Sequence, residues 1–350
     1  MADRVDVVIV GGGLAGLAAA AGLAQAGIGV RLYDRGHFEG RPGGGIVSGT
    51  TLGPLGGPSV PMEVPFDRDV GERRWLFLTR TGEVALDFLD APSPMPSEGL
   101  HTVRTSTLAP WLAERARTLG ADLRPGTAVD GLRREGRGPI SGVRVRGADV
   151  EALVTILADG GSLRATPNAP LRRPSAEVAE AFWTLPARSV SARLGARAGS
   201  GTVIEALFGE LSPEGPAGGY LLPFRSGIAV GAVVGTTAAP PGGAEELLGR
   251  FERHPSVTPL VQGGQRGAVT KTQLADRPEI GRPLSGEGFL AVGTAGGLAA
   301  VSATRFLAVD AALRSGAIAG EVARDAVINH DASALRLSAY PLSLGADGLL

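Results

Sequence analysis

Residues 5–34 read VDVVIVGGGLAGLAAAAGLAQAGIGVRLYD, and this stretch decides the fold. Val5–Val10 is a continuous apolar run, which is typical of a strand buried on both faces of a parallel sheet. The turn Gly11–Gly16 follows at once, and an alanine-rich helix then runs to about Ala26. Gly29–Asp34 has the pattern of a second strand that ends in an acid. The stretch therefore predicts one complete βαβ unit.

The glycine spacing in this unit predicts a dinucleotide site. Gly11 permits the tight turn after the strand, Gly13 lets the backbone approach a pyrophosphate, and Gly16 lets the helix pack on the strand. Leu14-Ala15 opens a helix whose positive dipole end faces the phosphates. Asp34 stands where an acid binds the ribose of the nucleotide. An acid at this position favours FAD or NAD over NADP.

Composition excludes several classes of function. The 350 residues are 43% hydrophobic and 20% charged with a net charge of -1, so nothing indicates nucleic-acid binding. The absence of cysteine excludes a disulfide, a cysteine nucleophile and an iron–sulfur cluster held by this chain. The four histidines lack metal-ligand spacing, so no metal site is predicted. We expect a cytoplasmic protein with at most peripheral contact with the inner face of the membrane.

The pattern along the chain predicts an α/β fold with a Rossmann-like nucleotide-binding domain and an inserted, mostly antiparallel β-sheet substrate domain. Within the insertion, Val190–Leu194 is expected to be a strand. After the insertion, a helix from about Thr304 to Ile328 is expected to close the core. The expected units are residues 1–174 (the first part of the nucleotide-binding domain, with an inserted loop and strand region at 43–102), 175–275 (the β-rich substrate domain), 276–330 (the closing part) and 331–350 (a tail).

Two further junctions resemble ligand-binding turns. The apolar strand Val154–Ala158 ends at Asp159-Gly160, where the acid either bonds a ribityl or ribose hydroxyl or simply caps a turn. Far downstream, the apolar strand ending at Val292 runs into Gly293-Thr294 and a glycine-rich turn. A second strand–glycine junction is expected if one long cofactor lies across both.

The order of these segments resembles the glutathione-reductase-type flavoproteins, which include aromatic hydroxylases, geranylgeranyl reductases and electron-transfer-flavoprotein:quinone oxidoreductases. The resemblance covers nearly the whole chain and is strongest to the FixC-like branch of the last group. The motifs that carry it are Tyr33-Asp34-Arg35-Gly36, Gly43–Gly49, Val103-Arg104, Ile156–Ser162, Val230–Gly235, Leu248–Gly264 and Ser315-Gly316.

This resemblance implies non-covalent FAD. It places Asp34, with its neighbour Arg35, at the adenosine ribose and Val129 at the adenine, which it contacts through its backbone. It places Arg104 near the phosphate or ribityl side and Gly45 near the isoalloxazine ring. The remaining cofactor-binding residues that it implies are Gly11, Gly13, Leu14, Ala15, Gly16, Asp159, Gly160, Gly293 and Thr294.

The chain departs from the family pattern at two places. The family has an acid after the glycine of the third strand, where this chain has Thr294. A threonine still hydrogen-bonds a hydroxyl, at a net worth of about 1 kcal/mol. The family also has a Glu-Gly pair at the start of the last helix, where this chain has Leu307-Ala308.

Three functions remain open at the level of sequence. The resemblance implies an FAD-dependent oxidoreductase that passes electrons from an electron-transfer flavoprotein or a ferredoxin-like iron–sulfur partner to quinone. A geranylgeranyl-reductase-like or hydroxylase-like enzyme that acts on an apolar small molecule is the first alternative. A degenerate flavoprotein that serves as a binding subunit is the second. No catalytic residue is assigned.

Overall fold

The first sheet contains the predicted βαβ unit. The computed structural model describes residues 3–40, 43–56, 64–88, 99–134, 136, 138–162, 176–195, 199–274, 283–298, 301–302, 305–306 and 308–350. The βαβ unit consists of β1 (Asp3–Val10), α1 (Leu14–Gln25) and β2 (Val30–Tyr33). The further parallel strands of this sheet are β7 (Asp122–Arg124), β10 (Ala148–Leu157) and β18 (Phe289–Ala291). The strand order is β18-β10-β1-β2-β7, so it reverses at β1. In such sheets, ligands bind outside the carboxyl ends of the strands at the point of reversal.

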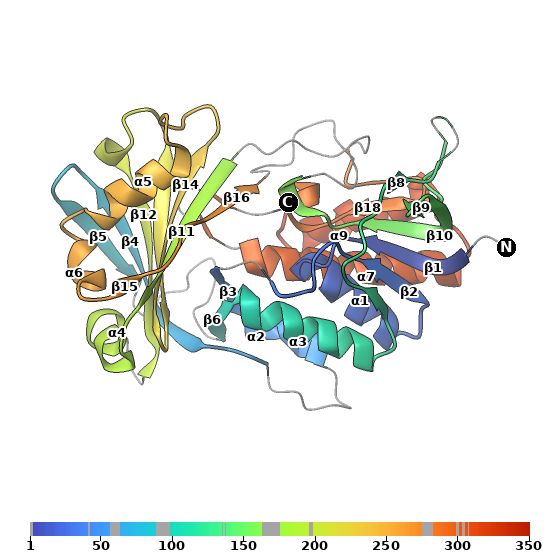
Figure 1. Ribbon diagram of the computed structural model, residues 1–350, viewed down its shortest axis with the longest axis horizontal. Helices are drawn as coiled ribbons and strands as arrows, with labels where there is room; N and C mark the ends of the chain where they lie inside the picture. Colours follow the sequence, from blue (N-terminus) through green and yellow to red (C-terminus); the bar gives the residue numbers. More distant parts are fainter. Residues whose placement is uncertain are drawn as a thin grey trace.

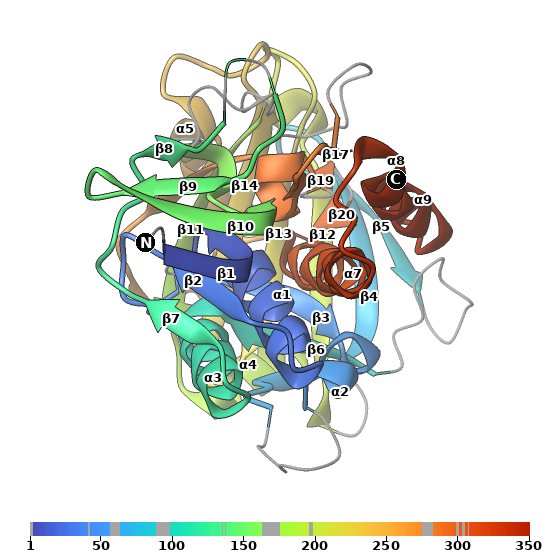
Figure 2. The ribbon, with the colours of Figure 1, turned by 90° about the vertical axis from the view of Figure 1, so that its right-hand side faces the viewer.

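Alternate residues of β1 enter two different cores, because successive side chains of a strand point to opposite faces. Val7 and Ile9 pack with the helices on one face, while Val8 and Val10 pack with a β-hairpin on the other. Figure 2 shows the helices gathered on one side of β1 and the hairpin on the other. These covering elements are α3 (Thr105–Thr118) and α7 (Ala308–Ile328), which join α1, and the hairpin β8 (Gly131–Leu132) with β9 (Gly142–Val145).

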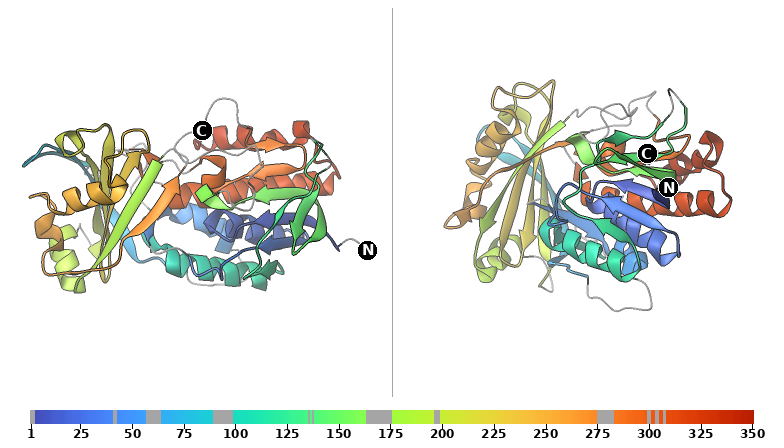
Figure 3. Two further views of the ribbon diagram at one scale, coloured as in Figure 1. Left: turned by 45° about the horizontal axis from the view of Figure 1, so that its top comes forward. Right: turned by 45° about the vertical axis from the view of Figure 1, so that its right-hand side comes forward.

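The second sheet has the order β15-β11-β14-β13-β12-β4-β6-β3, with β16 beside β11 and β5 beside β4. Its strands are β3 (Gly44–Ser48), β4 (Arg68–Leu78), β5 (Glu83–Phe88), β6 (Leu100–Arg104), β11 (Ala176–Thr184), β12 (Gly201–Leu207), β13 (Ala217–Phe224), β14 (Gly227–Gly235), β15 (Gln265–Arg266) and β16 (Thr270–Leu274). Helices α4 (Ala187–Leu194), α5 (Gly243–Glu252) and α6 (Thr258–Val261) cover its outer face. Its other face looks toward the first sheet (Figures 1 and 3).

Short elements complete the described chain. The C-terminal helices lie against α7 (Figure 2). No helix in the described part of the chain has the length and apolar character needed to cross a bilayer. The remaining elements are α2 (Gly49–Gly56), α8 (Ala334–Leu337), α9 (Ala339–Ala346), the 3-10 turns η1 (Gly160–Ser162), η3 (Gly209–Leu211) and η4 (Gly293–Gly296), and the strands β17 (Ser285–Gly286), β19 (Val301–Ser302) and β20 (Arg305–Phe306).

Two expectations about individual elements are wrong. The expected strand at Val190–Leu194 is part of helix α4, whose buried residues Val190 and Leu194 stand four positions apart. That spacing fits a helix face as well as strand alternation, and Pro186 immediately precedes the helix. The closing helix α7 begins at Ala308 rather than near Thr304, because the short strand β20 occupies the preceding positions.

Strands from the 43–102 region lie in the second sheet. β4 pairs with β12 in parallel, and β6 pairs with β3 and β4, so this region is hydrogen-bonded to the sheet of 175–275. The predicted boundaries at 174/175 and 275/276 fall beside or within 163–175 and 275–282. These ranges lie outside the described residues, and the boundaries stay predictions.

Candidate functional site

A cavity of about 620 Å³ lies between the two sheets. One wall is the turn between β1 and α1, and the opposite wall is formed by β11, β13 and β16. Its volume is within the range typical of cofactor and ligand pockets. The structure brings together most of the residues proposed from sequence, and those that line the cavity are Gly11, Gly13, Leu14, Ala15, Asp34, Arg35, Gly45, Val129, Asp159, Gly160, Gly293 and Thr294.

Of the three glycines in the GxGxxG turn, only Gly13 has open space beside it where a ligand can approach the backbone. A Cβ at Gly11 would overlap the carbonyl of Ala158, and one at Gly16 would overlap the carbonyl of Gly11. At Gly13 no atom lies within 4 Å of the position that a Cβ would take. The amide of Leu17 donates to the Gly13 carbonyl at 2.9 Å, so α1 begins here with its positive dipole end at the cavity. An anionic group fits this place.

Asp34 closes the other side of the turn. Its Oδ1 accepts the amide of Gly12 at 3.0 Å, and its Oδ2 accepts the amide of Gly36 at 2.9 Å. A carboxylate offers about four acceptor positions, so about two are left for hydroxyl groups of a ligand. The side chain is part-buried and lines the cavity, as a ribose-binding acid must.

The two downstream junctions meet at the cavity. η1, which follows Asp159, contacts η4, which contains Gly293 and Thr294. Gly293 has a φ of 54°, and its amide donates to Oγ of Ser315 at 3.0 Å. That amide is therefore engaged with α7, while the neighbouring Thr294 lines the cavity. Leu307, the second departure from the family pattern, lies outside the described residues.

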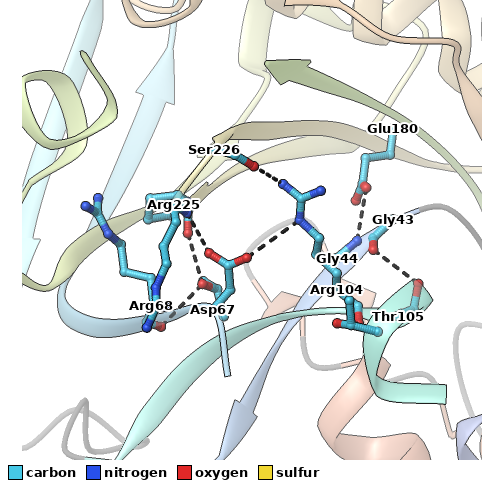
Figure 4. A network of polar contacts seen from close by, with 12 residues as sticks. Gly43, Gly44, Asp67, Arg68, Arg104, Thr105, Glu180, Arg225 and Ser226 are labelled. Carbon is cyan, nitrogen blue, oxygen red and sulfur yellow. Dashed lines mark hydrogen bonds and ion pairs between the residues drawn. The ribbon is translucent and has the colours of Figure 1, made fainter. Parts of the chain in front are cut away.

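Arg104 is held by side chains at the edge of the second sheet. Its guanidinium lies 4.1 Å from the centroid of the Phe182 ring, and its NH2 group donates to Oγ of Ser226 at 2.5 Å. Asp67 faces it at 3.6 Å (Figure 4). Stacking on an aromatic face and attraction to a carboxylate hold this side chain beside the second sheet. Arg104 is not part of the cavity lining, and its contact with the cofactor stays a prediction.

Comparisons with known proteins agree with this geometry. A family model described as "FAD binding domain" matches residues 4–226. The chain is 30% identical over 98% of its length to the "Probable electron transfer flavoprotein-quinone oxidoreductase YdiS" of Escherichia coli K12, and covers 81% of that protein. The chain belongs to the FAD-binding family of YdiS and FixC.

Further relatives support this assignment. Protein FixC of Salmonella typhi is 29% identical over 97% of the chain, which covers 81% of FixC. Among solved structures, a geranylgeranyl bacteriochlorophyll reductase-like protein of Thermoplasma acidophilum superposes with a TM-score of 0.74. That superposition covers 99% of this chain and 84% of the other at 19% identity, which is a likeness of fold alone. The protein is an FAD-dependent oxidoreductase of the FixC/YdiS family.

FAD is the cofactor of this FixC/YdiS-family protein, and the turn described above fits it. The open space at Gly13 and the start of α1 suit the pyrophosphate, and the Asp34 carboxylate suits the adenosine ribose. We propose these residues as its binding groups. FAD supplies the ability to accept and release electrons, a chemistry that no side chain here offers.

The sequence did not single out Glu180. It lies on β11 in the cavity wall, and its side chain is buried. Its carboxyl accepts the hydroxyl of Tyr220 at 2.5 Å and the amide of Gly44 at 3.1 Å (Figure 4 shows the bond to Gly44). Burial raises the pKa of Glu180 to about 7. The available signal was a glutamate between Val178 and Phe182 on one face of the strand, where its neighbours on that face are apolar.

Proposed function

We propose that this protein passes electrons from a reduced electron-transfer flavoprotein, or from a ferredoxin-type iron–sulfur partner, to a quinone. The observation that carries the proposal is the similarity to YdiS over 98% of the chain, because that relative is named as a probable electron transfer flavoprotein-quinone oxidoreductase. These 350 residues contain no cysteine and so cannot ligate an iron–sulfur cluster. A cluster that takes part in the proposed electron transfer is therefore assigned to the partner.

The form of the cavity supports an apolar acceptor. Its wall on the second sheet contains Val178, Leu222 and Leu274, which pack as part of one apolar cluster. The opposite wall is the turn around Gly13 and the Asp34 carboxylate. A ring that enters from the apolar side is thus held against a cofactor oriented from the polar side.

The proposed residues act by binding and orientation. The turn at Gly13 and the first turn of α1 hold an anion, and Asp34 fixes the direction in which the nucleotide lies. Electron transfer depends on proximity of donor and acceptor, so this fixed orientation is the main contribution of the first sheet.

The test uses the purified full chain loaded with FAD under anaerobic conditions. Reduced electron-transfer flavoprotein is added and the flavin spectrum is followed, and a water-soluble short-chain quinone is then mixed with the reduced protein. We expect bleaching of the flavin by the donor and recovery of its colour with quinone. A flavin that neither donor nor quinone changes contradicts the proposal. Substrate-dependent oxidation of NAD(P)H, or saturation of an isoprenoid double bond, would instead identify a hydroxylase or a prenyl reductase.

A further inference from the structure

The cavity wall on the second sheet contains a buried acid, Glu180. Glu180 is 8% exposed, and no arginine or lysine among the described residues forms an ion pair with it. Its two hydrogen bonds come from the Tyr220 hydroxyl and the Gly44 amide. Buried carboxyl groups are otherwise normally paired with a cation. Its position therefore calls for a role other than that of an ion-pair partner.

The bond between Tyr220 and Glu180 crosses an intervening strand. In the register of the sheet, Glu180 on β11 and Tyr220 on β13 are both opposite Gly231 on β14. A Cβ at Gly231 would overlap the Tyr220 ring, so the ring lies across β14 at a position that only glycine leaves open. Three strands thus cooperate to bring a phenol hydroxyl to one carboxyl group. This arrangement fixes the orientation of the acid.

Most charges around this acid are already paired. Arg104 lies over the ring of Phe182 and faces Asp67, and Glu205, opposite Tyr220 in register, binds Arg73. Lys271 is in register with Ala179, whose side chain points to the other face, and binds Glu245. The other titratable side chains that line the cavity are Tyr33, Asp34, Arg35, His37, Glu39 and Asp159.

This environment gives Glu180 a proton that it can release near neutral pH. Burial raises its pKa from 4.5 to about 7, while the bonds from Tyr220 and Gly44 oppose that rise. An acid whose pKa lies near the working pH is best suited to general acid catalysis. Burial also raises the pKa of Tyr220, so its hydroxyl keeps its own proton and orients the carboxyl.

We propose that Glu180 is the acid that protonates the acceptor at the second-sheet end of the cavity, and that Tyr220 is its positioning residue. The inference rests on the proposed function, because it takes a quinone as the acceptor. Conversion of a quinone to a hydroquinone adds two electrons and two protons. A reduced flavin bound in the cavity would supply the electron pair and one proton. The second proton leaves the Glu180 carboxyl for the quinone oxygen, and water then restores it to the carboxylate.

The test follows reoxidation of the dithionite-reduced, FAD-loaded protein by a short-chain quinone in stopped flow, from about pH 5 to about pH 9. The wild-type rate is expected to fall as the pH rises through about 7. Glu180→Gln keeps an oxygen for the Gly44 amide but carries no acidic proton. We expect it to be slower by about 10²-fold or more, with a flat profile. Glu177→Gln, on the opposite face of β11, is the matched control and should keep the wild-type profile.

Tyr220→Phe separates a positioning role from simple packing. The tyrosine hydroxyl donates to the carboxyl and so favours its charged form. Its removal is expected to shift the fall in rate to higher pH, which a loss of packing alone would not do. Infrared spectra of the FAD-free protein give a readout independent of activity. We expect a protonated-carboxyl C=O band that titrates near pH 7 and is missing from Glu180→Gln.

The outcomes distinguish this inference from the proposed function. If quinone reoxidises Glu180→Gln at the wild-type rate and with the wild-type pH profile, the inference fails and the proposed function stands. A carboxyl band that titrates near the ordinary glutamate pKa also overturns the inference. If quinone does not reoxidise the wild-type protein at all, both fail together.

Discussion

The backbone amide of Gly12 donates a hydrogen bond to Oδ1 of Asp34 across 3.0 Å. This bond joins the turn after β1 to the residue that follows β2. The loop proposed to hold the pyrophosphate and the acid proposed to hold the ribose are therefore one unit. A substitution on either side of the bond is expected to weaken FAD binding. The loss of affinity should depend on how much of the unit the substitution displaces.

Gly16→Ala tests the contact between helix and strand. An added Cβ would overlap the carbonyl of Gly11 and push α1 away from β1. Such overpacking costs about 1–3 kcal/mol, so we expect FAD affinity to fall about tenfold and the thermal midpoint to fall by several degrees. Gly22→Ala in the same helix is the control, because no atom lies within 4 Å of its added Cβ. That variant should bind FAD normally and unfold no earlier than wild type.

Asp34→Asn tests the ribose contact. The amide loses the charge and places an NH₂ group toward one of the backbone amides that Asp34 accepts. Hydrogen bonds to a charged group contribute about 1.5–3 kcal/mol, so titration with FAD should show a dissociation constant about 10- to 100-fold higher. Asp6→Asn is the control, since Asp6 accepts the amide of Gly29, the exposed residue before β2, away from the cavity. Equal FAD affinities for the two variants would contradict this assignment.

Thr294→Val tests the first departure from the family pattern. Thr294 lines the cavity, and the substitution removes its hydroxyl while it keeps the shape of the side chain. A loss of about 1 kcal/mol corresponds to FAD binding about fivefold weaker by fluorescence titration. Thr155→Val is the matched control, because the buried Thr155 hydroxyl finds no partner among the described residues. It should leave FAD affinity unchanged and raise the thermal midpoint, whereas unchanged binding in Thr294→Val would show that the hydroxyl contributes nothing.

The first sheet was predictable because its signals are local. An apolar strand, a glycine turn and an acid within residues 5–34 fixed β1, α1 and β2 nearly to their observed ends. The place of 43–102 in the second sheet could not be read in the same way. β4 pairs with β12 across more than a hundred residues of sequence, and a strand pattern does not state its partner. Val190–Leu194 failed because its apolar spacing satisfies two periods at once.

The site was predictable to the same extent. The spacing of Gly13 and Asp34 is typical of a dinucleotide-binding turn, and the structure places both residues at the cavity. Arg104 has no such constraint, and Phe182 and Ser226, which engage it, come from distant segments of the chain. Glu180 acquires its properties from Tyr220 through the register of three strands, which no local pattern expresses.

The buried carboxyl of Glu180 also predicts how stability depends on pH. Its pKa is raised in the folded state to about 7 from the ordinary 4.5, so the folded protein binds more protons than the unfolded chain between these values. The free energy of unfolding contributed by this group must then fall as the pH rises from about 4.5 to about 7, and stay low above that. The shift corresponds to at most about 3 kcal/mol.

Glu180→Gln removes this dependence. Urea unfolding of the FAD-free protein at several pH values should show a smaller fall in stability between about pH 4.5 and pH 7 than in wild type. Above pH 7 the variant should be the more stable of the two, because it buries no charge there. Glu245→Gln is the control. Glu245 is exposed beside Lys271, which lowers its pKa, so that variant should keep the wild-type fall. Identical pH dependence in Glu180→Gln and wild type would mean that the Glu180 carboxyl does not titrate in this range.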